Sequence, residues 1–281
     1  RGGGGGGGGG RVEGGGRAVP ETTPMPRTTA SANQTGGVGK TTTTVKLAAG
    51  LARAGQRVLL IDLGPQGNAT TGSGIDKRAA TPATLEVLTG EATLADARQP
   101  VPAGVDVLPA NADLTAAKVL LLQIERREFR LRDALGPIRD EYHYVLIDCP
   151  PALDMLTVNA LTAAGSVLIP MQCEYYALEG MSDLLDTIND IASSANPGLH
   201  VEGVLRSMFD PRSRLSRDVS EQLQSHFGER LYRTVIPRNV RLAEAPSHGL
   251  PVLDYDRSCV GSTAFLTLAG EMLRRHHLKA S

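Results

Sequence analysis

A glycine-rich run that ends in Lys-Thr is the segment of this sequence with the most definite chemistry. It reads NQTGGVGKT over residues 33–41 and is called the phosphate loop below. Glycines let backbone N–H groups converge on phosphate oxygens, and the start of a following helix adds the positive end of its dipole. Lys40 can reach the β- and γ-phosphates of a nucleotide, and the Thr41 hydroxyl can coordinate Mg²⁺. Gln34 stands where the strict motif G-x-x-x-x-G-K-[ST] has its first glycine.

A bare glycine-rich turn is the alternative to a nucleotide site. The same turn followed by Lys-Thr at a strand-to-helix junction is rarely accidental, so we favour nucleotide binding. The residues expected to contact the nucleotide and its Mg²⁺ are Gly36, Gly37, Val38, Gly39, Lys40, Thr41 and Thr42.

Two aspartates stand at the ends of apolar runs, where they can serve the same site. Asp148 follows residues 145–147, and Asp62 follows residues 58–61. Because the carboxyl ends of parallel strands meet at one edge of a sheet, Asp148 should emerge beside the phosphate loop. Such an aspartate can hold the Mg²⁺ shell, as a Walker B carboxylate does. The alternative is an aspartate that only caps a turn.

Short apolar runs alternate with helical patterns from about Thr28 onward, and these elements must position the loop and the aspartates. A weak strand precedes the loop, and further strands are expected at residues 58–61, 105–108, 145–147, 167–170 and 201–205. Helices are expected from the loop to Gly55 and at residues 112–122, 125–141, 155–164, 175–195, 216–227 and 260–277. This alternation predicts an α/β fold of one domain, with a mostly parallel central sheet and helices on both faces.

The composition is that of an ordinary globular protein. Lys and Arg number 29 against 30 Asp and Glu, so any nucleic-acid surface must be a local patch. The three cysteines lack the spacing of a disulfide framework or a zinc site, and no apolar stretch is long enough to span a membrane, so we expect a cytoplasmic protein.

The first 26 residues differ from the rest of the chain. They hold twelve of the 32 glycines and almost no large apolar side chains. Such a segment cannot offset the entropy of ordering, so we expect a disordered tail at 1–26 ahead of a domain at 27–281. A nucleic-acid-binding tail and an over-extended reading frame ahead of Met25 are both open.

Several strings in the sequence resemble the ParA/Soj family of chromosome and plasmid partitioning ATPases, which carry a deviant Walker A loop. They are the phosphate loop, IDLGPQGN at 61–68, LIDCPP at 146–151, QCEYYALEG at 172–180, IPRNVRL at 236–242 and EAPS at 244–247. The resemblance implies a P-loop ATPase that binds ATP and Mg²⁺, forms a homodimer through the nucleotide, and binds DNA non-specifically at the nucleoid. It also implies a ParB-type partner, with Lys40, Asp62 and Asp148 as catalytic residues and Asp62 in the metal and water shell.

Two positions depart from the pattern of this family. Thr35 stands where the family has a signature lysine that contacts phosphates across the ATP-bound dimer. Gly64 stands where the family has an aspartate implicated in orienting the attacking water. Threonine has no charge and glycine has no side chain, so ATP binding can survive while turnover should be impaired. A naturally slow switch protein and a damaged or miscalled sequence both remain open.

The same resemblance points to a base site and a DNA surface. Pro237 and Asn239 match family positions that flank the adenine, and an amide suits hydrogen bonding to a base edge. Residues 206–241 carry eight arginines against four acidic residues, and arginines on loops can neutralise phosphates without reading bases. Arg212 and Arg241 match positions that the family uses for DNA binding. A merely solvated charged face is the alternative.

Three other functions are weighed against this one. A hydrolysis-deficient scaffold would keep ATP as a structural ligand on DNA. A MinD-like ATPase would bind membrane through its C-terminal helix, but residues 274–279 have little apolar surface, so we expect no stable membrane association. An electron carrier like the nitrogenase iron protein would need two cysteines per subunit for a shared cluster, which iron–sulfur absorbance would reveal.

Overall fold

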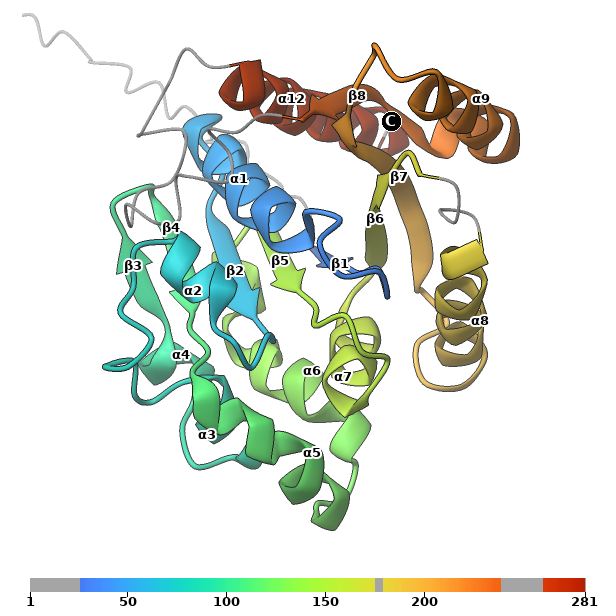
Figure 1. The fold of residues 1–281 in the computed structure, drawn as a ribbon. Helices are drawn as coiled ribbons and strands as arrows, with labels where there is room; N and C mark the ends of the chain where they lie inside the picture. Colours follow the sequence, from blue (N-terminus) through green and yellow to red (C-terminus); the bar gives the residue numbers. More distant parts are fainter. Residues whose placement is uncertain (1–25, 175–178, 239–259, 281) are drawn as a thin grey trace, which may run out of the picture.

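The apolar runs of the sequence form one central sheet in the computed structural model, which describes residues 26–174, 179–238 and 260–280. The sheet has eight strands in the order β3-β4-β2-β5-β1-β6-β7-β8 (Figure 1). Neighbouring strands are parallel, except that β3 runs antiparallel to β4. The strands are β1 (Arg27–Ser31), β2 (Val58–Asp62), β3 (Gln99–Val101), β4 (Val105–Leu108), β5 (Tyr144–Asp148), β6 (Ser166–Gln172), β7 (His200–Phe209) and β8 (Leu231–Pro237).

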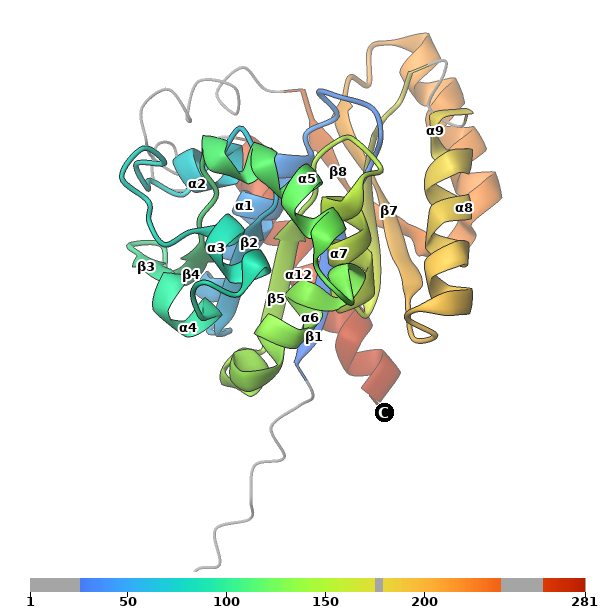
Figure 2. The ribbon, with the colours of Figure 1, turned by 90° about the horizontal axis from the view of Figure 1, so that it is seen from below.

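Helices cover both faces of the sheet, as the alternation of patterns predicts. On one face lie α1 (Lys40–Arg53) and α12 (Val260–Ala280), whose Leu47, Leu51 and Phe265 join one apolar cluster with the strands. The other α-helices of the described residues are α2 (Asn68–Gly72), α3 (Thr84–Thr89), α4 (Leu94–Ala97), α5 (Ala117–Leu120), α6 (Arg130–Leu135), α7 (Met155–Ala163), α8 (Glu179–Ser194) and α9 (Arg214–Phe227). Figure 2 shows α3, α6 and α7 in front of the strands and α12 behind them.

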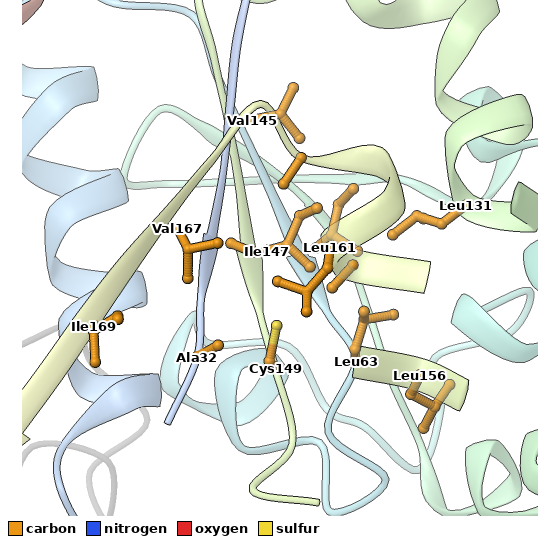
Figure 3. Packing of buried hydrophobic residues seen from close by; sticks show 14 of the residues in the cluster. Ala32, Leu63, Leu131, Val145, Ile147, Cys149, Leu156, Leu161, Val167 and Ile169 are labelled. Atoms are coloured by element: carbon orange, nitrogen blue, oxygen red, sulfur yellow. The ribbon is translucent and has the colours of Figure 1, made fainter. Parts of the chain in front are cut away.

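The larger apolar cluster lies between the sheet and the second layer of helices. Ile147 on β5, Val167 on β6 and Leu161 on α7 are fully buried and point into this cluster (Figure 3). The strand residues come from bare apolar runs, which is expected for parallel strands covered on both faces. The core therefore fixes β5 and β6 on either side of β1, the strand that leads into the phosphate loop.

The central strand β1 is more polar than its position suggests. Its residues Thr28, Thr29 and Ser31 are all buried. The Thr29 and Ser166 hydroxyls lie 3.1 Å apart and bond to each other, whereas the Thr28 and Ser31 hydroxyl oxygens have no hydrogen-bond partner among the described residues. The strand is held mainly by its backbone ladder, because it pairs with β5 along its whole length and with β6 over its second half.

Two stretches differ from the helices expected from periodicity. Residues 112–122 are divided between a 3₁₀ segment, α5 and a second 3₁₀ segment. Residues 125–141 form only the short α6 between two 3₁₀ segments. Arg126 has a left-handed backbone with φ 52°, and Pro137 lies just after α6, so a continuous helix cannot pass through this region.

The C-terminal helix α12 is tied to the edge strand β8 by side chains. Both carboxylate oxygens of Glu271 accept backbone N–H groups of β8, from Arg233 and Thr234, at 2.8 Å each. Arg275 donates to the carbonyl of Leu231 at 2.8 Å and pairs with Glu271 at 2.9 Å. No helix among the described residues has the length and apolar character needed to span a membrane.

Candidate functional site

The phosphate loop joins β1 to α1 at the carboxyl edge of the sheet. Gly37 and Gly39 have φ values of 78° and 82°, which only glycine adopts without strain, and Gly39 is the N-cap of α1. Gly36, Gly37 and Thr35 are exposed at the tip of the loop, whereas Val38 is buried beneath it. The loop thus presents its backbone at the positive end of a 14-residue helix.

Lys40 lies at the first position of α1 and folds back over the loop. Its Nζ atom donates to the carbonyl of Thr35 at 2.8 Å, and only 7% of the residue is exposed. Burial lowers the pKa of Lys40, and the negative charge of Asp148 opposes that shift. The ammonium group is therefore held against the backbone of the phosphate loop.

Asp148 ends β5 directly beside the amino end of α1. Its carboxylate accepts the Thr41 hydroxyl at 2.7 Å and the Thr44 hydroxyl at 3.2 Å. Burial raises the pKa of Asp148 to about 7, with a further contribution from the charge of Asp62. Sequence reasoning missed Thr44, although its position three residues after Thr41 puts the two hydroxyls on one face of the helix.

Thr41 and Asp148 together fit a magnesium ion. Hydroxyl and carboxylate oxygens are donors that Mg²⁺ prefers, and Mg²⁺ usually takes one or two protein ligands and completes its shell with phosphate oxygens and water. The 2.7 Å contact between the two side chains places both oxygen donors together at the amino end of α1, beside the phosphate loop.

Asp62 ends β2 beside Asp148, its partner in the β2–β5 register, but it is fully buried and its carboxylate is occupied. One oxygen accepts the Gly64 N–H at 2.9 Å, and the other accepts the Thr70 N–H at 2.8 Å and the Thr70 hydroxyl at 2.7 Å. Burial raises the pKa of Asp62, and hydrogen bonds from Thr70 and Gly64 oppose the shift. The carboxylate holds the turn between β2 and α2.

The residues expected to contact the base and DNA are only partly described. Pro237 ends β8, and the N–H of Arg238 donates to the carbonyl of Phe209 at the end of β7. Asn239 and Arg241 lie outside the described residues. Arg212 is exposed just before α9, and its guanidinium pairs with Asp210 at 3.1 Å, a contact that the arginine count did not reveal.

Comparison with known proteins identifies the family of this chain. A family model described as an AAA domain matches residues 26–201. An uncharacterized protein of Pseudomonas putida is 60% identical, over 89% of this chain and 96% of the relative. The chromosome partitioning protein ParA of Caulobacter vibrioides is 52% identical, over 89% of this chain and 94% of its own. The sporulation initiation inhibitor protein Soj of Bacillus subtilis is 47% identical, over 88% of this chain and 98% of its own.

Solved structures share the fold over nearly the whole chain. Cobyrinic acid a,c-diamide synthase from Mycobacterium smegmatis, with bound ADP and magnesium, has a TM-score of 0.79 and 36% identity, covering 90% of this chain and 96% of its own. The septum site-determining protein MinD of Pyrococcus horikoshii, complexed with Mg-ADP, has a TM-score of 0.73 and 25% identity, covering 88% and 96%. The loop, the two aspartates and these relatives together show that the chain belongs to the ParA/Soj family of P-loop chromosome-partitioning ATPases.

Proposed function

We propose that this ATPase binds MgATP at the phosphate loop, dimerises through the nucleotide, and binds DNA non-specifically to drive chromosome or plasmid segregation. The observation that carries the proposal is the meeting of Lys40, Thr41 and Asp148 at the amino end of α1. The relatives named ParA and Soj support the partitioning role. Solved neighbours that hold ADP or an ATP analogue with magnesium support the choice of ligand.

Each of the described side chains would have its own role in binding. Lys40 would exchange the carbonyl of Thr35 for phosphate oxygens, which are the stronger partners of an ammonium group. Thr41 and Asp148 would hold Mg²⁺, which neutralises charge on the transferred phosphoryl group. Asp62 would act through the turn that it holds, since both its oxygens already accept hydrogen bonds.

A second candidate is a scaffold that binds ATP and DNA but hardly hydrolyses ATP. It is favoured by Thr35 and Gly64, which offer neither the cation nor the carboxylate that the family places there. A charge placed to stabilise the transition state is worth roughly 10²–10³ in rate, so its loss affects hydrolysis far more than binding. Both candidates share the nucleotide site and differ only in turnover.

The proposed DNA surface includes Arg212, just before α9, and Arg241, which lies outside the described residues. Arg212 and Arg241 would neutralise phosphates of the DNA backbone without reading bases. A ParB-type partner bound to DNA would stimulate hydrolysis and reset the cycle, and the protein would then work at the nucleoid in the cytoplasm. The support for these steps is the identity with the ParA and Soj relatives.

Replacing Lys40 tests the nucleotide site. Lys40→Ala should abolish saturable MgATP binding in titration calorimetry and, with it, any ATP-dependent DNA binding, because it removes the cation held in the loop. Lys118→Ala is the matched control, since it removes a positive charge whose described ionic partner is Asp154, outside the loop. Equal MgATP affinity in the parent and Lys40→Ala would contradict the assignment.

A further inference from the structure

The end of β7 touches the phosphate loop from the side opposite to Asp148. The Ser207 hydroxyl donates to the carbonyl of Val38 at 2.7 Å, and only 2% of Ser207 is exposed. Strand β7 is separated from β1 by β6, so this bond reaches across one strand to hold the loop. The loop is thus fixed by β5 through Asp148 and by β7 through Ser207.

Met208 follows Ser207 and has a backbone that its side chain disfavours. Its φ is 49°, in the left-handed region, which non-glycine residues seldom adopt and which tends to persist at functional sites. The side chain is 37% exposed, and its Cε atom lies 3.8 Å from where a Cβ on Gly39 would stand. The Gln172 amide nitrogen lies next to the Met208 sulfur. A thioether is therefore held over the amino end of α1.

The layout of the sheet gives the direction in which a nucleotide must run. Asp148, on β5, marks the metal end of the triphosphate on one side of β1. With the metal there, the nucleoside would extend to the other side of β1, over the ends of β6, β7 and β8. Phe209 on β7 pairs with Pro237 on β8, the residue expected beside the base. Met208 lies between the phosphate loop and that position.

We propose that Met208 contacts the nucleoside half of bound ATP and forms the apolar wall between the phosphate loop and the base. The side chain is unbranched, and its polarisable thioether makes favourable contacts with flat aromatic rings. Its left-handed backbone is what places the side chain over Gly39 rather than along the strand. The inference rests on the proposed nucleotide site and adds a residue that neither the phosphate loop nor the Pro237 segment supplies.

The test compares ATP with inorganic tripolyphosphate, which has no nucleoside. Met208→Gly keeps the left-handed backbone, which glycine adopts freely, and removes only the side chain. Its affinity for MgATP should fall about tenfold, which is typical when one apolar side chain that contacts the ligand is removed from a binding site. Its affinity for tripolyphosphate with Mg²⁺ should stay within about twofold of the parent. Met208→Leu, which keeps the apolar volume, should retain most of the MgATP affinity.

Ser207→Ala is the contrasting variant, because it cuts the bond to Val38 and should weaken both ligands alike. An equal loss of both ligands in Met208→Gly would show that Met208 supports the loop and would overturn the inference. Unchanged affinity for both ligands would overturn it as well. A parent chain that binds neither ligand would refute the nucleotide site itself. If the parent binds both ligands and Met208→Gly binds MgATP as tightly as the parent, only the role of Met208 is refuted.

Discussion

Thr35 and Gly64 lie in different surroundings, and these surroundings decide what a lysine at position 35 or an aspartate at position 64 would contact. Thr35 is exposed at the tip of the loop, where a longer side chain would extend away from the protein. A Cβ on Gly64 would stand 3.2 Å from a carboxylate oxygen of Asp62, which is closer than most such contacts. An aspartate at position 64 would therefore need a small shift of the turn and would add a negative charge near Asp62.

Restoring both residues should reveal whether they limit turnover. We expect the parent chain to hydrolyse ATP very slowly in the presence of DNA and partner. Thr35→Lys with Gly64→Asp should raise DNA-stimulated phosphate release by roughly 10²-fold or more, because a cation and a carboxylate are returned to one transition state. The gain should exceed the product of the single gains if the two groups act as a unit.

The single variants serve as controls for this experiment. Gly64→Asp alone should help little, since the dimer still lacks its bridging lysine and the new carboxylate crowds Asp62. MgATP affinity, measured by calorimetry, should change less than the rate in all three variants. A parent chain that already turns over as fast as the double variant would refute this account of the two positions.

Individual secondary-structure elements differ in how well the sequence predicts them. Strands β2 and β5 are apolar runs that end in an aspartate, so the sequence predicts both the strands and their functional side chains. Strand β8 has exposed and half-buried positions among buried ones, as an edge strand does, and its pattern does not stand out from that of a loop. Sequence reasoning also misses Ser207 and Met208, because their place beside the loop depends on β7 lying next to β6, which no local pattern encodes.

The contact between α12 and β8 should make stability depend on pH. Burial alone would raise the pKa of Glu271, but hydrogen bonds from Thr234 and Arg233 and the charge of Arg275 bring it below its ordinary value of 4.5. A lowered pKa means that the stabilisation is complete above about pH 4.5 and is lost as the pH falls through the folded-state pKa. The helix should therefore loosen from the sheet in acid.

Glu271→Gln tests this dependence by urea unfolding. At pH 7 the variant should lose about 1.5–3 kcal/mol of unfolding free energy, the usual range for hydrogen bonds to a charged group. The difference from the parent should shrink at pH values below about 4, where the native carboxyl is itself protonated. Glu221→Gln, on the outer face of α9, is the control and should change little. A constant difference at all pH values would contradict the role of the ionised carboxylate.

In the whole molecule, the nucleotide site and the proposed DNA surface are separate. The phosphate loop lies at the centre of the sheet, and Arg212 lies beyond β7 at the start of α9. Arg212 is already paired with Asp210, so DNA must compete with an internal carboxylate for this guanidinium. The local charge balance, not only the number of arginines, should set the affinity for DNA.

Two neighbouring substitutions should shift DNA affinity in opposite directions. Arg212→Ala should weaken binding equally for all sequences and make the slope of log affinity against log salt shallower by about 0.9, the value for one fewer neutralised phosphate of B-DNA. Asp210→Asn should strengthen binding, because it removes a negative charge and releases the guanidinium. Fluorescence anisotropy with unrelated duplexes in the presence of ATP measures both. If neither substitution changes the affinity for DNA, the DNA surface lies elsewhere on the protein.

The bonds from α12 to β8 also bear on aggregation. An open sheet edge offers unpaired N–H and C=O groups to a strand from another molecule. At β8, Glu271 and Arg275 occupy three of these groups, and at the opposite edge β3 has only three residues, one of them Pro100, which has no N–H. The side-chain contacts at β8 and the shortness of β3 disfavour the addition of a strand from another molecule at either edge.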